Sequence, residues 1–235
     1  MPFARIIDPE WLDELPAEDP RAERSRRDLK RINRFMFQAA IVARLMKRAC
    51  EGSRPPRRIL ELGAGDGTFM LSVARVLAPA WPGVRLSLLD RQNIVAPATR
   101  EAFRRLGWET ETVCADVFAF FGSAPEMSAD LITANLFLHH FEPERLSVLL
   151  DGIARATEAF VACEPERGLS GLIGSRLLWA IGCNDVSRHD AITSVRAGFR
   201  DAELSALWPK GRWALAENAA FPFSHCFVAR RDGAS

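Results

Sequence analysis

The stretch ILELGAGDGTF, residues 59–69, is an apolar run that breaks into a loop with a glycine at every second position. RILELGAG (58–65) has the apolar character of a buried strand, and TFMLSVARVLAPAW (68–81) after it has the spacing of a helix. Glycines at such a turn let the backbone adopt positive φ and approach a ligand closely. The stretch therefore predicts a ligand site at the carboxyl end of a strand in an open α/β sheet.

The spacing of the glycines separates the classes of ligand. A dinucleotide-binding loop has the pattern G-x-G-x-x-G, with its last small residue three positions after the second glycine. Here Thr68 stands at that position, and Gly67 comes one step earlier. A phosphate-binding P-loop needs Gly-Lys-Ser/Thr, which this loop lacks. The spacing therefore disfavours both classes.

Acidic residues stand beside the loop and at the ends of the next two apolar runs. Glu61 precedes the glycines, Asp90 closes LSLLD, and Asp116 follows VCA. A carboxylate has two acceptor oxygens, so Asp90 is suited to both ribose hydroxyls of a nucleoside. Asp116 is suited to the amino group of adenine, with Val117 and Phe118 covering a face of the base. Glu61 would lie near a positive charge, so the acids favour a nucleoside that carries a cationic sulfur.

The rest of the chain alternates between short apolar runs and helical stretches, which predicts a parallel sheet covered on both faces. Further strands are expected in VRLSLLD (84–90), ETVCADV (111–117), ADLITANLFL (129–138) and AFVACEPE (159–166). Helices are expected between them and in the 169–182 and 189–209 stretches. Near the end, RWALAENAA (212–220) and SHCFVARR (224–231) are too close for a crossover, so they predict an antiparallel pair.

The N-terminal region has a different pattern. Residues 1–20 read as an irregular or briefly helical arm, and an amphipathic helix with one break near Arg34 is expected after it. EGSRPPRR (51–58) then marks a junction. We therefore predict an N-terminal arm and helical lid over residues 1–55, and a ligand-binding domain over 56–235 with a lid insert at 168–190.

The motifs LELGAGDGTF, LLD, ADV and ITANLFLHHF, in this order, resemble the class I S-adenosylmethionine-dependent methyltransferases over about residues 59–230. The resemblance implies a Rossmann-like α/β fold: a seven-stranded, mostly parallel sheet with a C-terminal antiparallel hairpin. It also implies S-adenosyl-L-methionine as the cofactor. The cofactor-binding residues that it implies are Glu61, Gly63, Ala64, Gly65, Gly67, Asp90, Arg91, Asp116, Val117, Asn135 and Leu136.

Several absences favour a small-molecule acceptor. Asn135-Leu136-Phe137 lacks the prolines of the Asn/Asp-Pro-Pro-aromatic turn of enzymes that methylate amino groups of DNA, and there is no Pro-Cys nucleophile of the cytosine type. The formal net charge of +1, from 31 basic and 30 acidic residues, gives no surplus for gripping a phosphate backbone. The five cysteines have no zinc-ligand spacing, so no metal is expected.

Histidines and apolar residues supply the candidates for the acceptor side. A neutral imidazole can take a proton from a phenol or enol. His140 in LHHF is the preferred base and His139 the alternative. His189, followed by Asp190 at an expected helix start, is a third candidate, although Ser187 or Asp190 could instead cap that helix. Cover over the acceptor is expected from Phe35, Met36 and Trp179, with Asp190 beside them.

Two stretches, DLKRINRFMF (28–37) and SRHDAITSVRAGF (187–199), resemble the methyltransferases found beside type III polyketide synthases. This resemblance implies a phenolic, polyketide-derived or quinone-like acceptor. Two alternatives stay open: a methyltransferase acting on protein or RNA, and a non-catalytic regulatory subunit that binds the cofactor. Scattered cysteines and the lack of a signal peptide or membrane-length apolar run predict a cytoplasmic protein, as a monomer or homodimer.

Overall fold

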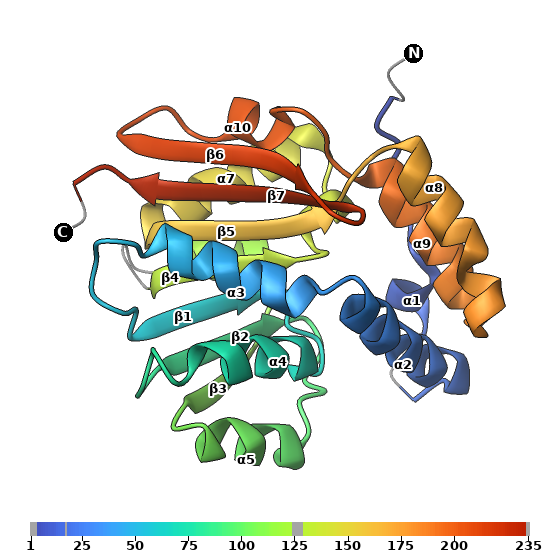
Figure 1. Ribbon diagram of the computed structural model, residues 1–235, viewed down its shortest axis with the longest axis horizontal. Helices are drawn as coiled ribbons and strands as arrows, with labels where there is room; N and C mark the ends of the chain where they lie inside the picture. The colour runs from blue at the N-terminus through green and yellow to red at the C-terminus, as the bar shows by residue number, and fades with distance from the viewer. Residues whose placement is uncertain (1–3, 17, 124–128, 234–235) are drawn as a thin grey trace.

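The computed structural model describes residues 4–16, 18–123 and 129–233. A seven-stranded sheet in the order β3-β2-β1-β4-β5-β7-β6 forms its centre (Figure 1). All neighbours pair in parallel except β7, which is antiparallel to both β5 and β6. This confirms the predicted Rossmann-like fold with its C-terminal hairpin. The strands are β1 (Arg58–Leu62), β2 (Arg85–Asp90), β3 (Glu109–Cys114), β4 (Ala129–Asn135), β5 (Thr157–Pro165), β6 (Trp213–Ala220) and β7 (Ser224–Arg231).

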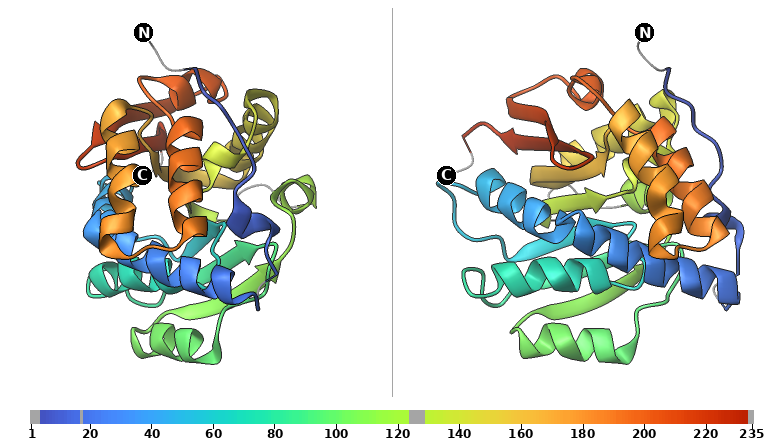
Figure 2. Two further views of the ribbon diagram at one scale, coloured as in Figure 1. Left: turned by 90° about the vertical axis from the view of Figure 1, so that its right-hand side faces the viewer. Right: turned by 45° about the vertical axis from the view of Figure 1, so that its right-hand side comes forward.

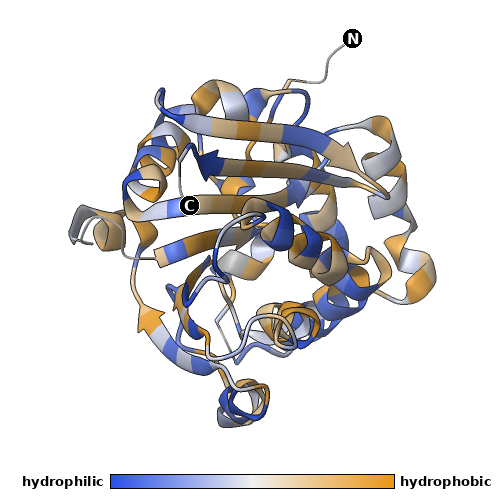
Figure 3. Cartoon of the chain, turned by 60° about the vertical axis from the view of Figure 1, so that its left-hand side comes forward, coloured by the Kyte–Doolittle hydropathy of each residue, from blue (hydrophilic) through white to orange (hydrophobic). Residues whose placement is uncertain are grey.

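Successive strand residues point to opposite faces, and both faces are covered. Ile59 belongs to the core on one face and Leu60 to the core on the other. The first face is covered by α3 (Gln38–Ala49), α4 (Thr68–Leu77) and α5 (Pro97–Arg105). The second is covered by α6 (Val117–Ser123), α7 (Pro143–Ala156) and α10 (Glu203–Leu207). Figure 3 shows hydrophobic residues along the middle strands. Because both faces of these strands are buried, their sequences are nearly continuous apolar runs.

The expected N-terminal helix is two helices. The first, α2 (Pro20–Phe35), ends just after Arg34, and Phe37 at the junction has a left-handed φ of 55°. Because Val42, Met46 and Ala49 are buried against the sheet, α3 belongs to the core of the domain. Of the region assigned to arm and lid, only the part before α3 therefore extends past the end of the sheet.

Five helical segments gather beyond the carboxyl ends of the parallel strands (Figures 1 and 2). They are α1 (Trp11–Glu14), α2, α8 (Leu169–Arg176), the 3-10 helix η2 (Leu177–Ile181) and α9 (Asp185–Ala197). We call these five elements the helical cap. In it α9 contacts α1, α2 and α8, and it also contacts η1 (Leu138–His140), the 3-10 turn after β4. The cap thus joins the arm to the segment after β5.

The start of α9 differs from the sequence expectation. The helix begins at Asp185, and the side chain of Asn184 caps it by accepting from the Ser187 backbone N at 2.8 Å. The prediction that Ser187 or Asp190 caps the helix was therefore wrong. The Ser187 hydroxyl instead bonds Ser25 and Asp28 of α2, a contact between distant segments that no local pattern contains.

Within the described part of the chain, none of the helices combines the length and the apolar character that crossing a membrane requires.

Candidate functional site

The glycine loop lies between β1 and α4, at the point where the strand order reverses between β1 and β4. Gly63, Gly65 and Gly67 have φ values of 67°, 54° and 71°, in the left-handed region that glycine adopts without strain. A Cβ at Gly63 would lie 2.4 Å from the Phe137 ring, whereas a Cβ at Gly65 would meet nothing within 4 Å. The loop therefore touches the segment after β4 on one side and presents bare backbone to open space on the other.

Asp90, at the carboxyl end of β2, holds the loop in shape. Its Oδ2 accepts from the Gly65 backbone N at 2.8 Å, and its Oδ1 accepts from the Gln92 backbone N at 2.8 Å. The loop is also tied to β2 by Ala64, whose N donates to the Leu89 carbonyl at 3.1 Å. Each carboxylate oxygen has a second lone pair, so Asp90 can still accept from ribose hydroxyls.

Glu61 is the buried acid of the site. Its side chain is 3% exposed, and its Oε2 has no hydrogen-bond partner among the described residues. Burial raises the pKa of this carboxyl well above its usual value, and the nearby charges of Asp90 and Asp66 raise it further. A buried acid without a partner, beside a bare glycine loop, fits a ligand that brings an ammonium or sulfonium group.

The remaining acid of the loop, Asp66, faces the cap. It forms a 2.6 Å ion pair with Lys30 of α2 and also accepts from the Thr68 hydroxyl. Burial alone would raise the pKa of Asp66, but the bonds from Lys30 and Thr68 lower it. Its negative charge is thus already paired, which leaves Glu61 as the acid that lacks a partner.

The predicted adenine residues lie at the start of α6. Asp116 is exposed, and its Oδ1 accepts from the backbone N of Phe118 at 2.9 Å and of Ala119 at 3.2 Å. Val117 is buried, and Phe118 packs edge-on against Phe141. In this structure Asp116 therefore caps the first turn of α6, at the same edge of the sheet as Asp90. Arg91 is exposed, next to Asp90.

Asn135 and Leu136 lie where β4 ends, beside β1. The Asn135 Nδ2 donates to Gln38 at 3.3 Å, and the Leu136 backbone N donates to the Cys163 carbonyl at 3.0 Å. Leu136 has a φ of 52°, a conformation that costs a residue with a Cβ about 1–3 kcal/mol and is concentrated at functional sites. This strained turn directs the following residues, Phe137 to His140, toward the cap.

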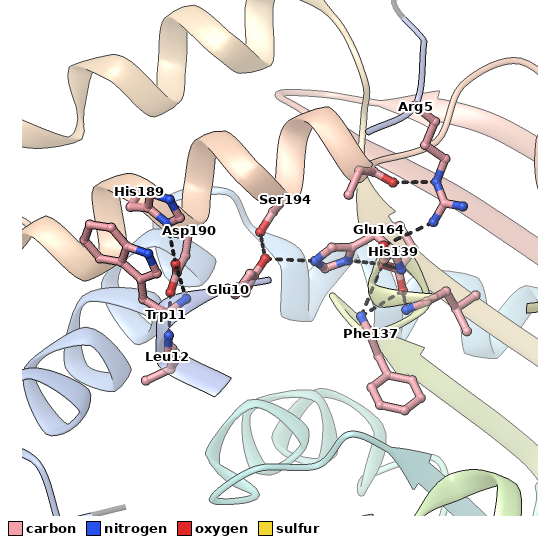
Figure 4. Close-up of polar contacts among 12 residues, drawn as sticks. Arg5, Glu10, Trp11, Leu12, Phe137, His139, Glu164, His189, Asp190 and Ser194 are labelled. Carbon is pink, nitrogen blue, oxygen red and sulfur yellow. Dashed lines mark hydrogen bonds and ion pairs between the residues drawn. The ribbon is translucent and has the colours of Figure 1, made fainter. Parts of the chain in front are cut away.

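Glu164 at the end of β5 anchors η1. It is fully buried and accepts from the backbone N of Phe137 at 3.1 Å and of Leu138 at 3.0 Å (Figure 4). Its Oε2 lies 2.8 Å from the Nδ1 of His139. The other ring nitrogen of His139, Nε2, lies 3.3 Å from Glu10 of the N-terminal arm. His139 is therefore held between two carboxylates from distant segments of the chain, the N-terminal arm and β5.

The two carboxylates change the ionisation of this group. Burial alone would lower the pKa of His139, but its hydrogen bonds with Glu10 and Glu164 and their charges raise it to about 9. Burial would raise the pKa of Glu10, but its bond with His139 and the nearby imidazoles lower it to about 2. In this arrangement His139 is an imidazolium with both N–H groups engaged, so it has no lone pair with which to accept a proton.

The structure separates His189 from the η1 histidines. Figure 4 shows it at the far side of Glu10 and Ser194, on α9. Its ring stacks on Trp11 at 3.9 Å, and its Nδ1 lies 3.0 Å from Asp190. Asp190 in turn accepts from the backbone N of Trp11 at 2.9 Å and of Leu12 at 3.0 Å. His189 and Asp190 thus fasten the arm to α9, whereas the rings of His139 and His140 lie side by side, 4.2 Å apart.

Of the predicted cover, Met36 is half-buried at the α2–α3 junction, while Phe35 and Trp179 are 75% and 64% exposed. The structure does not bring these two rings onto η1. Sequence reasoning missed Arg5, Glu10 and Glu164. Glu164 ends a strand in the same way as Asp90 and could have been found by that rule. Arg5 donates to the carbonyls of His139 and Phe141 at 3.1 Å. Nothing in the sequence around Arg5 or Glu10 predicts that these residues reach the turn after β4.

Known proteins were compared with this chain by sequence and by fold. Residues 59–159 match the protein family described as "Methyltransferase domain". No curated protein matches the chain. Among solved structures, the plantazolicin methyltransferase BamL, in complex with a triazolic desmethylPZN analog and SAH, superimposes with a TM-score of 0.64 at 13% identity. That alignment covers 91% of this chain and 92% of the other.

Two further structures have the same fold. The mitomycin 7-O-methyltransferase MmcR is similar with a TM-score of 0.58 at 20% identity, over 94% of this chain and 60% of that one. The magnesium protoporphyrin IX methyltransferase ChlM from Synechocystis PCC 6803, with bound SAH, has a TM-score of 0.59 at 15% identity, over 92% and 96% of the two chains. Residues 59–159 thus form a methyltransferase domain, and the chain as a whole has the fold of these methyltransferases, two of which were solved with SAH.

Proposed function

We propose that this methyltransferase acts on a small, largely apolar acceptor, at the oxygen or an activated carbon of a phenolic, polyketide-derived or quinone-like compound. The observation that carries the proposal is the enclosure of the acceptor side by the chain's own arm. Arg5 and Glu10 contact η1 directly, and both also contact α9, Arg5 at the Ala197 carbonyl and Glu10 at the Ser194 hydroxyl (Figure 4). A long polymer would need an open groove at this place, whereas a small molecule needs only a covered pocket.

The loop residues have separate tasks in this proposal. S-adenosylmethionine, when bound, supplies a methyl group on a cationic sulfur. Glu61 would neutralise the positive charge of the methionine portion, Asp90 would hold the ribose, and Asp116 with Val117 the adenine. Alignment of the two reactants in such a covered site contributes about 7–11 kcal/mol to lowering the barrier.

An acceptor hydroxyl must also lose its proton. Of the three histidines proposed for this task, His139 has both ring nitrogens bonded to carboxylates, and His189 is stacked on Trp11 and bonded to Asp190. His140 is half-buried on the same turn as His139, four residues after the strained Leu136. We propose His140 as the base because this turn follows β4 at the edge of the sheet that also holds the glycine loop. General-base help is worth roughly 10²–10⁴-fold in rate.

The names of proteins with this fold agree with a small acceptor: they act on plantazolicin, on mitomycin and on magnesium protoporphyrin IX. Their identities to this chain are 13–20%, so they do not identify its acceptor. The polyketide-type acceptor rests on the resemblance of residues 28–37 and 187–199 described above.

Cofactor binding is tested first, by calorimetric titration with S-adenosylmethionine and its demethylated product, with NAD as the comparison. Gly65→Ala places a Cβ in the open space before the loop, and we expect at least ~10-fold weaker binding of both nucleosides. Gly83→Ala is the matched control, because Gly83 has a similar φ of 69° and also nothing within 4 Å, but lies outside the loop. Both variants carry a similar backbone cost, about 1–2 kcal/mol. Heat with NAD alone would overturn the proposal.

The acceptor class is tested with labelled S-adenosylmethionine and a panel of phenols, alkylresorcinols, quinols, total RNA and protein extract. We expect label in small phenolic compounds only, and mass spectrometry would assign the methyl group to oxygen or carbon. Label in RNA or protein, with none in the phenols, would favour the macromolecular alternative. Cofactor binding without transfer to any acceptor would favour a regulatory subunit. Either result contradicts the proposal.

A further inference from the structure

The arm and η1 together place three metal-ligating side chains at one point. Glu10, His139 and His140 each offer one ligand atom, and these atoms all lie within 4.8 Å of one another. We propose that these residues form a binding site for a divalent transition-metal ion of the Zn²⁺ type. No segment of the sequence predicts it, because Glu10 and His139 are 129 positions apart.

The distance between the first two ligand atoms fits such an ion. The Nε2 of His139 and the Oε1 of Glu10 are 3.3 Å apart. Two ligand atoms of a tetrahedral zinc ion, at bond lengths of about 2.0–2.2 Å, are separated by about 3.3–3.5 Å. An ion can therefore enter between these two atoms with little movement of the side chains, replacing the proton that they share.

The surrounding residues orient the ligands as those of a metal site do. Glu164 accepts from the Nδ1 of His139 at 2.8 Å, which leaves Nε2 as the nitrogen that points to Glu10. A histidine that donates its second N–H to a buried carboxylate is the usual support of a metal-binding imidazole. Glu10 is itself held by the hydroxyl of Ser194 on α9 (Figure 4).

The charge and chemistry of the group favour a transition metal over magnesium or calcium. Glu10 and Glu164 bring two negative charges to a site whose His139 side chain is 2% exposed. A divalent ion with two neutral imidazoles balances both carboxylates. Imidazole suits Zn²⁺ and its neighbours in the transition series, whereas Mg²⁺ and Ca²⁺ prefer all-oxygen sites.

Three protein ligands leave a coordination position open, as in catalytic rather than structural zinc sites. Under the proposed function, on which this role rests, the open position would take an oxygen of the acceptor. With the ion bound, His140 would be a ligand instead of the base proposed above, and the ion would make the acceptor hydroxyl more acidic. Without the ion, His140 keeps the role of the base. The preferred acceptors would be those that can present an oxygen anion, such as phenols and enols.

The test is a calorimetric titration of the full chain, freed of metal with a chelator, with Zn²⁺ and separately with Mg²⁺. We expect one Zn²⁺ per chain, bound more tightly than Mg²⁺, and a rise in melting temperature with Zn²⁺. Glu10→Gln and His140→Gln should each weaken Zn²⁺ binding at least ~10-fold, and Glu164→Gln about 10–100-fold through the orientation of His139. Asp185→Asn, at an exposed acid of α9 outside the group, is the matched control and should bind Zn²⁺ as the wild type does.

Co²⁺ gives a second measurement that does not depend on activity. A Co²⁺ ion bound to two imidazoles and a carboxylate at low coordination number should give visible absorption bands, which His140→Gln should weaken and Asp185→Asn should not. Absence of Zn²⁺ binding, or equal affinity in the wild type, Glu10→Gln and His140→Gln, would overturn the site.

The same samples separate this inference from the proposed function. A chain that binds the demethylated cofactor product and methylates phenols after chelation, but binds no Zn²⁺, would overturn the metal site alone. A chain that binds Zn²⁺ through Glu10 and His140 but methylates no small acceptor would overturn the proposed function and leave the site in place.

Discussion

The backbone N of Gly65 lies 2.8 Å from the Oδ2 of Asp90, so the acid predicted to hold a ribose also shapes the glycine loop. Asp90 closes β2 and the loop follows β1, and the two strands are parallel neighbours. If Asp90 binds the ribose as predicted, one carboxylate both holds the glycine loop and accepts from the ligand. A change at Asp90 should therefore affect both the loop and the ligand.

Asp90→Asn tests this double role. It leaves the Gly65 or the Gln92 backbone N without a good acceptor, which should cost about 1–3 kcal/mol of unfolding free energy, and it should weaken binding of the demethylated cofactor product at least ~10-fold. Asp130→Asn is the matched control, because Asp130 accepts from the backbone N of Arg57 and Arg58 at the other end of the sheet. Urea unfolding and calorimetry measure both quantities. Equal losses of affinity in the two variants would show that Asp90 acts only through stability.

Glu61→Gln should separate stability from binding. Because the folded-state pKa of Glu61 is raised above its usual value of 4.5, its stabilising effect is complete below about pH 4.5 and is lost as the pH rises through the folded-state pKa. The glutamine keeps the neutral shape at every pH. We expect the variant to be more stable than the wild type at pH 8, with a smaller difference at pH 5, and to bind S-adenosylmethionine at least ~10-fold more weakly. A variant that is less stable than the wild type at pH 8 would contradict this.

Asp190→Ala tests how the arm is fastened. The change removes the acceptor of the Trp11 and Leu12 backbone N–H groups and should cost about 1–3 kcal/mol locally. We expect faster cleavage of the arm in limited proteolysis, with affinity for the demethylated cofactor product within about twofold of the wild type. Asp185→Ala, an exposed acid on the same helix, is the control and should leave the cleavage rate unchanged. Slow cleavage of both variants would show that other contacts hold the arm.

His225 gives a prediction about pH at a place far from the glycine loop in the chain. Its Nδ1 and Nε2 each lie 2.8 Å from a carboxylate, of Glu166 and Glu217 respectively. Burial alone would lower the pKa of His225, but its hydrogen bonds with these two carboxylates raise it. A raised folded-state pKa means that the stabilisation is complete below about pH 6.5 and is lost as the pH rises through the folded-state value.

His225→Gln should therefore lower the unfolding free energy by about 1–3 kcal/mol at pH 6 and by less at pH 9. Burial alone would raise the pKa of Glu217, but its hydrogen bonds with His225, Ser205 and Leu204 lower it. Glu217 therefore sets the acid side of this window, because its stabilising contribution is present above its usual pKa of 4.5 and is lost as the pH falls through the folded-state value. Urea unfolding of the wild type and of His225→Gln at pH 6 and pH 9 measures the difference in unfolding free energy. The contributions of the other titrating groups cancel in this difference. A difference that does not change with pH would contradict the assignment.

The strands and the glycine loop could be predicted because their signals are local. Residues 59–62 and 129–135 read as apolar runs since both faces of the sheet are covered. The positive φ of Gly63, Gly65 and Gly67 favours glycine at those positions, so the loop can be recognised from the sequence alone. The carboxyl ends of parallel strands lie at one edge of the sheet, so the sequence alone predicts that Glu61, Asp90 and Asp116 lie near one another.

The acceptor side could not be predicted in the same way. The sequence indicated histidines near the end of β4 but not their state, because the partners of His139 come from β5 and from the N-terminal arm. His189 and Asp190 read as a base and its neighbour, yet in the structure they fasten Trp11 and Leu12. The sequence predicts a helix from His189, but α9 begins four residues earlier, at Asp185, with Asn184 as its cap. Ser187, one of the predicted caps, instead bonds α2.

By itself, then, the sequence determined the order of strands and helices along the chain, the glycine loop and the acids that gather beside it at one edge of the sheet. These depend on hydrophobic period, backbone conformation and strand ends, each of which is written in a few consecutive residues. Only the tertiary structure decided the ionisation of His139, the role of Asp190 and the meeting of Glu10 with His139 and His140. Those depend on burial and on charges from distant segments. The ion pair of Glu10 with His139 joins residues 129 positions apart, so the sequence around neither residue predicts it.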